Sequence, residues 1–280
     1  MTHLISVADL QSHLGQGSSL VVLDCRFDLF DAAAGGHDFA RGHIPGAHYA
    51  RLDENLAGAK TDAQGQFHGR HPLPERAQWA AQVGRWGIGP DTPVVAYDDH
   101  GACYAARAWW LLRWLGHGPV RVLDGCATAW RAAGGAWGIT EREAPTLAPY
   151  PERAPLMPVI DTAAVQATLG SCTLIDARAG ERFRGEVEPL DRVAGHIPGA
   201  RQRFFKDNLS ADGHFKSPEQ LRREFLALGM DGAAICYCGS GVTACHNLLA
   251  LAQAGLGDAR LYPGSWSEWC SDPQRPIARG

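Results

Sequence analysis

Apolar residues along this chain alternate between short continuous runs and segments with helical spacing. In the second half, the run "AAIC" (residues 233–236) has the composition of the end of a buried strand. The next segment, "TACHNLLALAQAG" (residues 243–255), has apolar residues at helical spacing and ends in glycine, as helices commonly do. The pattern therefore predicts a strand-to-helix turn between them.

The same alternation extends through the whole second half of the chain. It predicts helices over residues 163–170, 217–229 and 243–255, and strands over residues 172–178, 233–238 and 259–262. Ser217 followed by Pro218 and Gln220 is typical of a helix start. Such alternation favours an α/β domain whose mostly parallel sheet is flanked by helices on both faces.

Four segments of the first half recur in the second half in the same order, which predicts two copies of one domain. The pairs are "VVLDCR" and "TLIDAR" (21–26, 173–178), "GHIPGA" twice (42–47, 195–200), "PVVAYDDHG" and "AAICYCGSG" (93–101, 233–241), and "RVLDGCATAW" and "RLYPGSWSEW" (121–130, 260–269). We place an N-terminal domain over residues 1–142, a linker over 143–158 and a C-terminal domain over 159–280. The linker carries five prolines, which cannot continue a helix or a central strand.

Composition limits the class of protein. The 280 residues are 45% hydrophobic and 20% charged, as in an ordinary globular protein, and the net charge of -4 gives no sign of a nucleic-acid-binding surface. The N-terminus has no secretory pattern and no apolar stretch is long enough to span a membrane. The eight cysteines form no C-x-x-C pair. We therefore expect reduced cysteines in a cytoplasmic protein without nucleic-acid or membrane partners.

The loop after the predicted strand 233–238 carries candidate chemistry at Cys238. In open α/β sheets, ligands bind beyond the carboxyl ends of the strands, where Cys238 stands. Gly239 and Gly241 allow successive N–H groups to converge on one anion, and the helix predicted from Thr243 directs its positive end there. These features favour the nucleophilic thiolate form of Cys238 over the alternative of a buried structural cysteine.

The chain resembles the tandem-domain sulfurtransferases of the rhodanese family. The resemblance rests on "CGSGVTAC", the two "GHIPGA" segments, "DAR", "RFRG" and the "DGC" and "PGSW" segments, and it covers nearly the whole chain. The loop itself is similar to that of the 3-mercaptopyruvate sulfurtransferases. The resemblance implies two rhodanese-like domains, of which only the C-terminal one is catalytic. Asp98 aligns with Cys238, and an aspartate there supplies no soft nucleophile and would repel an anionic substrate.

The family's reaction is transfer of a sulfane sulfur without a metal or other cofactor. The resemblance implies that Cys238 takes sulfur from a small-molecule donor, becomes a persulfide and passes the sulfur to a thiol or cyanide, with a thioredoxin-like protein among the candidate acceptors. The CGSGVT loop lacks Lys and Arg, whereas rhodaneses that favour thiosulfate typically carry basic residues there. We therefore expect 3-mercaptopyruvate as the donor, with thiosulfate as the alternative.

The resemblance also suggests which residues bind the donor. Arg182 of "RFRG" matches an arginine that holds the mercaptopyruvate carboxylate, as suits bidentate guanidinium geometry. The family's second arginine usually follows "EP", but Leu190 stands there, and Arg192 is the candidate substitute. The remaining predicted binding residues belong to the loop: Gly239, Gly241, Val242 and Thr243.

A Ser–His–Asp set that activates or protonates the substrate has been proposed for this family. Ser240 matches the serine, and His71 and Asp53 of the first domain match the other two members. His43 and His196 lie in the repeated "GHIPGA" segments, which suggests a shared structural role.

Three other functions are weighed against sulfur transfer. A cysteine phosphatase would need a longer loop closed by an arginine, which this sequence lacks. A metal site would draw on Cys236, Cys238, Cys245 and His246, but their spacing has no paired C-x-x-C. A persulfide relay protein would pass sulfur to a protein partner without appreciable small-molecule turnover.

Overall fold

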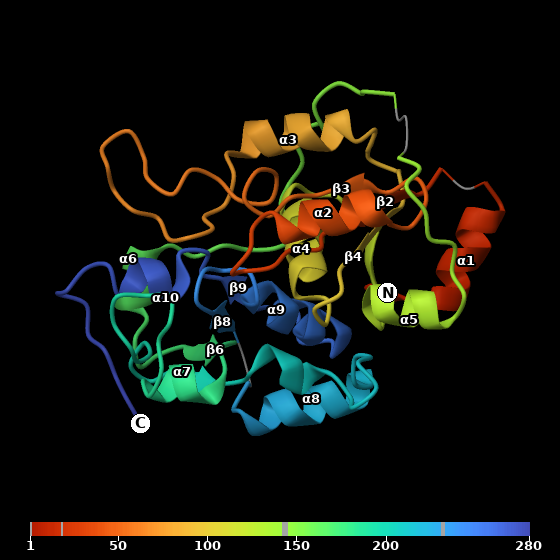
Figure 1. Cartoon of the computed structure of the whole chain (residues 1–280). Helices are drawn as coiled ribbons and strands as arrows, with labels where there is room; N and C mark the ends of the chain where they lie inside the picture. Colours follow the sequence, from red (N-terminus) through yellow and green to blue (C-terminus); the bar gives the residue numbers. More distant parts are fainter. Residues whose placement is uncertain (1, 18, 142–144, 231–232) are drawn as a thin grey trace. The chain divides into compact units, whose positions relative to one another are not determined.

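The computed structural model describes residues 2–17, 19–141, 145–230 and 233–280, and it divides into two compact units (Figure 1). Unit 1 comprises Met1–Gly58, Pro74–Met157 and Ala211–Phe215. Unit 2 comprises Ala59–Leu73, Pro158–Ser210 and Lys216–Gly280.

This grouping differs from the contiguous boundaries expected from the repeat. Residues 59–73 belong to unit 2. The Arg70 N–H, for example, donates a hydrogen bond to the Ser267 hydroxyl over 3.1 Å. Of the expected linker, residues 143–144 lie outside the described residues, and the part up to Met157 packs with unit 1. The Tyr150 N–H, for instance, donates to the Ala80 carbonyl over 2.9 Å.

Unit 1 is built on a parallel sheet in the order β1-β5-β4-β2-β3. Its strands are β1 (Leu4–Ile5), β2 (Val21–Asp24), β3 (His48–Tyr49), β4 (Val94–Tyr97) and β5 (Val120–Leu123). Its helices are α1 (Val7–Gly15), α2 (Ala34–Arg41), α3 (Arg76–Arg85), α4 (Cys103–Trp114) and α5 (Cys126–Ala132). The strands β2 and β4 are buried along their whole length, as expected for a parallel sheet covered by helices.

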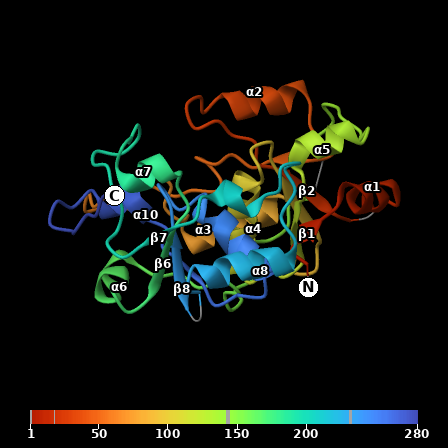
Figure 2. The ribbon, with the colours of Figure 1, turned by 90° about the horizontal axis from the view of Figure 1, so that it is seen from below.

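Unit 2 repeats this plan with a parallel sheet in the order β7-β6-β8-β9. Its strands are β6 (Thr173–Asp176), β7 (Arg201–Gln202), β8 (Ala234–Tyr237) and β9 (Arg260–Leu261). Its helices are α6 (Thr162–Ala167), α7 (Gly180–Arg184), the 3-10 helix η1 (Phe205–Asn208), α8 (Pro218–Ala227), α9 (Ala244–Gln253) and α10 (Ser265–Trp269). Helix α9 packs on β8, β9 and α8, and Figure 2 gives a second view of α8.

The predicted α/β class and the duplication are confirmed. Strand β2 pairs with β4 in unit 1 as β6 pairs with β8 in unit 2, in parallel in both. The Ser217 hydroxyl accepts the Gln220 N–H at the start of α8, as the capping pattern predicts. The elements are shorter than predicted: α6 ends at Ala167 and β6 at Asp176.

One buried ion pair ties each sheet to its "GHIPGA" segment. In unit 1, Arg26 pairs with Asp24 over 2.7 Å and donates to the carbonyl oxygen of Gly42. In unit 2, Arg178 makes the same pair with Asp176 over 2.7 Å and donates to the first glycine of the second segment. Burial lowers the pKa of Arg178, but the attraction to Asp176, the hydrogen bonds to it and the charges of Tyr237 and Glu188 together outweigh burial and raise the pKa. These arginines are therefore structural.

The repeated histidines also have one structural role in both units. The His43 ring stacks on Phe39 with 3.9 Å between centroids and bonds the Phe39 carbonyl over 2.9 Å. The His196 ring stacks on Phe183 at 3.8 Å and bonds the Phe183 carbonyl over 2.7 Å. Both rings pin the helix before the "GHIPGA" segment to that segment, so the shared structural role is confirmed.

Candidate active site

Cys238 lies directly beyond the carboxyl end of β8 and before α9, where the sequence places it. Only 1% of its surface is exposed. The Gly241 N–H donates a hydrogen bond to the Cys238 sulfur over 3.1 Å. The Cys238 N–H in turn donates to the Ser265 hydroxyl over 3.1 Å. The sulfur is thus held in a fixed position at the base of the loop.

Helix α10 holds the backbone of this loop. The Trp266 N–H donates to the Cys238 carbonyl over 2.9 Å, and the Ser267 N–H donates to the Gly239 carbonyl over 3.0 Å. Ser265 itself has a left-handed φ of 55°, and the aligned Cys126 of unit 1 has a φ of 63°. Sequence reasoning did not identify Ser265, although the aligned "GC" and "GS" pairs before these two helices mark the position.

Gly241 is required by the loop on two grounds. Its φ of +78° is a left-handed conformation that other residues rarely adopt. A β-carbon at this position would also lie 2.4 Å from the Pro263 carbonyl oxygen. The glycine predicted from the sequence therefore allows the turn that brings its own N–H to the Cys238 sulfur.

In unit 1 the equivalent loop holds an anion of its own. Asp98 follows β4 and is fully buried. Its carboxylate accepts backbone N–H groups from His100 and Ala102 at 2.8 and 2.9 Å, and from Tyr104 and Ala105 at 2.8 and 2.9 Å. Burial raises the pKa of Asp98, and these four bonds oppose the rise. The loop is therefore an anion cradle that the chain's own carboxylate fills.

In unit 2, three of the four matching backbone N–H groups have no acceptor among the described residues. Counted from Cys238, the positions equivalent to the first three donors of unit 1 are Ser240, Val242 and Ala244. Within the described part of the chain, the backbone N–H groups of these three residues donate to no acceptor. The fourth, Cys245, donates to the Val242 carbonyl over 3.0 Å. The loop around Cys238 can therefore bind an anion, such as a thiolate, a persulfide or part of a donor.

Two guanidinium groups lie beside this loop. A β-carbon on Gly239 would lie 2.7 Å from Nη2 of Arg70 and 3.5 Å from Nη1 of Arg182. Arg182 comes from α7, as predicted, and Arg70 comes from residues 59–73. Arg70 was not predicted, although it directly precedes the candidate His71 in "GRHPLP". Together the two arginines place two guanidinium groups beside Gly239, the neighbour of Cys238.

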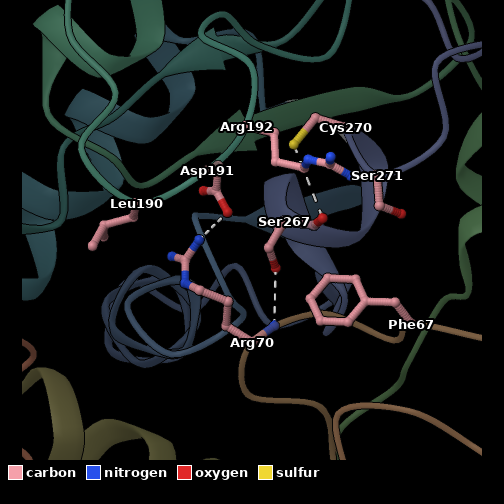
Figure 3. A pocket seen from close by; sticks show the side chains of 8 residues that line it. All are labelled: Phe67, Arg70, Leu190, Asp191, Arg192, Ser267, Cys270 and Ser271. Carbon is pink, nitrogen blue, oxygen red and sulfur yellow. Dashed lines mark hydrogen bonds and ion pairs between the residues drawn. The ribbon is translucent and has the colours of Figure 1, made fainter.

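The arginines belong to a chain of alternating charges. Arg178 pairs with Glu188 over 3.3 Å, and Glu188 pairs with Arg182 over 2.6 Å. Asp191 then pairs with Arg182 over 3.4 Å and also with Arg70. Figure 3 shows the Arg70 and Asp191 side chains pointing toward one another. The series runs from the structural pair at the end of β6 to the arginines beside the loop around Cys238.

The structure brings two of the predicted Ser–His–Asp residues together. His71 Nδ1 lies 2.8 Å from the Ser240 hydroxyl, and both residues are buried. Asp53 belongs to unit 1, where its exposed side chain lines a cavity of about 360 Å³ with His37 and Arg51. The participation of Asp53 in the set stays a prediction.

A cavity of about 520 Å³ extends from Arg70 along unit 2 (Figure 3). Phe67 and Leu190 line it together with Asp191 and the exposed Arg192. Within residues 145–230 and the other described ranges, the Arg192 side chain makes no hydrogen bond or ion pair. Arg192 is thus placed at this cavity, whereas Arg70 and Arg182 are the arginines next to the loop.

Across the described residues, no three or more His, Cys, Asp and Glu side chains are arranged to hold a metal ion. In the same part of the chain, no helix is long and apolar enough to cross a bilayer.

Comparison with known proteins identifies two rhodanese-like domains and relatives named as sulfurtransferases. The family profile "Rhodanese-like domain" matches residues 6–133 and 161–272. A Pseudomonas aeruginosa protein named "Probable 3-mercaptopyruvate sulfurtransferase" is 48% identical over 99% of this chain and 98% of its own length. A Mycobacterium tuberculosis protein named as a candidate thiosulfate sulfurtransferase is 42% identical over 99% and 97%. The 3-mercaptopyruvate sulfurtransferase structure from Leishmania major, 28% identical, superposes with a TM-score of 0.83 over 96% of this chain and 74% of that one.

Proposed function

Because this chain belongs to the rhodanese family of sulfurtransferases, we propose that it moves a sulfane sulfur from 3-mercaptopyruvate, through a persulfide on Cys238, to a thiol or cyanide. The observation that carries the proposal is the contrast between the two cradles. The loop around Cys238 leaves backbone N–H groups open, whereas the loop of unit 1 is filled by the carboxylate of Asp98. Unit 1 is then the non-catalytic copy.

The reaction proceeds in two balanced steps. The Cys238 thiolate attacks the thiol sulfur of mercaptopyruvate, an S–S bond forms, and the C–S bond breaks with its electron pair passing to the enolate of pyruvate. The enolate carbon then takes the proton of the transferred sulfur, which leaves pyruvate and the anionic persulfide. In the second step cyanide takes the outer sulfur as thiocyanate and regenerates the Cys238 thiolate. The open N–H groups stabilise the persulfide anion.

Ser240 and His71 support the first step. The negative charge on the leaving group develops at the carbonyl oxygen of the donor, which becomes the enolate oxygen. The Ser240 hydroxyl can donate a hydrogen bond to that oxygen, and His71, 2.8 Å from the hydroxyl, orients it.

The charge of the site favours mercaptopyruvate as the donor. Its carboxylate can accept hydrogen bonds from Arg70 and Arg182, the guanidinium groups beside Gly239. The loop itself has no Lys or Arg to compensate the second charge of thiosulfate. Thiosulfate is the second candidate donor, since the Mycobacterium tuberculosis relative carries that name.

The donor and the acceptor are small molecules in this proposal, and a thioredoxin-like protein thiol is a further candidate acceptor. The cytoplasmic location expected from the cysteines stays a prediction.

The test is a comparison of kcat/KM for 3-mercaptopyruvate and for thiosulfate, with cyanide as acceptor, on the purified reduced protein. We expect a preference for mercaptopyruvate of at least about 10-fold, because the dianion is more costly to desolvate. A preference for thiosulfate would overturn the choice of donor. Turnover with neither would overturn small-molecule sulfur transfer and favour a persulfide relay to a protein.

Arg182→Ala is expected to raise KM for mercaptopyruvate about 10- to 100-fold, because a charge-assisted hydrogen bond to the carboxylate is lost. Arg184→Ala is the matched control, because Arg184 lies in the same short helix but pairs with the exposed Glu186. Steady-state kinetics of both variants, each shown to be folded by thermal unfolding, measure the difference. An unchanged KM in the Arg182 variant would contradict the assigned role.

A further inference from the structure

Asp191 stands beside the position where the family's second arginine is expected. The sequence reads "EPLDR", so that Leu190 takes the expected place and Asp191 follows. The Asp191 side chain is only 5% exposed, although it lines the cavity next to the loop. It pairs with both Arg70 and Arg182, the two guanidinium groups next to Gly239. A carboxylate of the chain thus occupies one side of the predicted anion site.

Asp191 changes the charge that an incoming donor meets. Asp176 and Arg178 form one neutral pair, and Glu188 and Arg182 form a second. The remaining charge of Arg70 is balanced by Asp191. The three pairs beside Gly239 are therefore neutral together before a donor binds, and Arg192 adds one exposed positive charge at the cavity. Burial raises the pKa of Asp191, whereas the hydrogen bond and the attraction to Arg70 oppose that rise, and the ion pairs with Arg70 and Arg182 favour the ionised carboxylate.

Asp191 leaves part of each guanidinium group available to a donor. It accepts from Nη1 of Arg70 and from Nη2 of Arg182. Among the described residues, Nη2 and the buried Nε of Arg70 and Nη1 of Arg182 have no hydrogen-bond partner. The nitrogen nearest to a β-carbon on Gly239 is the unpaired Arg70 Nη2, at 2.7 Å, and the unpaired Nη1 of Arg182 lies at 3.5 Å, as does its paired Nη2. A donor carboxylate can therefore bind without displacing Asp191.

We propose that Asp191 sets the charge of the donor that the site accepts, and that it favours a monoanionic donor over a dianionic one. The inference rests on the proposed sulfur transfer. Each unit of negative charge on the donor is repelled by the buried carboxylate, so that thiosulfate is repelled about twice as strongly as mercaptopyruvate. The Asp191 carboxylate also offsets the repulsion between the guanidinium groups of Arg70 and Arg182 and so keeps them side by side. A bound monoanionic donor without Asp191 would offset that repulsion less well.

Asp191→Asn tests this inference, because asparagine keeps the shape and one acceptor oxygen but removes the charge. We expect the ratio of kcat/KM for thiosulfate to kcat/KM for mercaptopyruvate to rise at least about 10-fold, equivalent to about 1.4 kcal/mol. Glu186→Gln is the matched control, because it removes an exposed carboxylate from the same segment, paired with Arg184. A ratio within about twofold of wild type in the Asp191 variant, or an equal rise in the control, would overturn the inference.

A binding measurement separates this inference from the proposed function. Titration calorimetry measures the affinity for sulfate, a dianion, and for pyruvate, a monoanion. The two proteins compared are Cys238→Ser and the double variant that also carries Asp191→Asn. We expect the added substitution to raise the affinity for sulfate relative to pyruvate about 10-fold. Should neither donor support turnover in the wild-type protein, this shift would still support the role of Asp191. No shift, in a protein whose thermal unfolding matches that of Cys238→Ser, would overturn it.

Asp191→Ser provides a second variant for the case in which asparagine destabilises unit 2. It also removes the charge and has a smaller side chain, so it is expected to change the donor ratio in the same direction. A ratio that rises in one folded variant and not in the other would contradict a charge effect.

Discussion

Cys238→Ser is expected to lower kcat/KM at least about 1,000-fold with either donor, because a neutral hydroxyl does not form or release a persulfide. The side chain is 1% exposed and receives the Gly241 N–H, so the substitution changes one atom in a fixed environment. The measurement is thiocyanate formation under steady-state conditions with cyanide as acceptor.

Cys103→Ser is the control for this prediction. Cys103 is the first residue of α4 in unit 1 and is buried there. Its loss is expected to change kcat/KM by less than about twofold in the folded protein. Retention of more than about a tenth of wild-type activity by Cys238→Ser would refute its role as nucleophile.

His71→Ala is expected to lower kcat/KM for mercaptopyruvate about 100-fold, because the Ser240 hydroxyl loses the partner that orients it toward the developing enolate. The loss with thiosulfate is expected to be smaller, about 10-fold or less, because sulfite leaves as a stable anion and needs no such stabilisation. A role that is only structural would reduce both activities alike. Steady-state kinetics with the two donors provide this comparison.

Two further variants complete the test of His71. Ser240→Ala, like His71→Ala, is expected to lose more activity with mercaptopyruvate than with thiosulfate. The double variant of His71 and Ser240 is expected to lose little more activity than either single variant, because the two residues act as a unit. His68→Gln is the control, since His68 lies in the same segment but bonds Asp62 over 3.1 Å. Additive losses in the double variant would contradict the coupling.

The elements around Cys238 could be predicted from the sequence because local patterns determine them. A short apolar run predicted β8, and apolar residues at helical spacing predicted α9. Gly239 and Gly241 indicated the turn at Cys238. The repeat did more, because the aligned segments show that Asp98 of unit 1 takes the place of Cys238. The sequence suggested only a repelling charge there, whereas the structure shows a carboxylate bonded to four N–H groups.

The position of Arg70 could not be predicted in the same way. Arg70 reaches the loop because residues 59–73 pack with unit 2, and no periodicity within that segment indicates where it packs. Arg192 was the expected substitute for the family's arginine at the position of Leu190. The position of a residue along the chain, however, does not determine where its side chain points. The neighbouring Asp191 contacts Arg70 and Arg182, while Arg192 is exposed at the cavity. Side-chain direction in an irregular segment depends on tertiary packing.

The central claim is that Cys238 carries the sulfur between the donor and the acceptor. Its most direct test is the intact mass of the reduced protein after one equivalent of 3-mercaptopyruvate, followed by peptide mapping without reductant. We expect one added sulfur atom on the peptide that contains Cys238, and we expect cyanide to remove this sulfur completely as thiocyanate. An added sulfur on another cysteine, or continued turnover with no sulfur on Cys238, would contradict it.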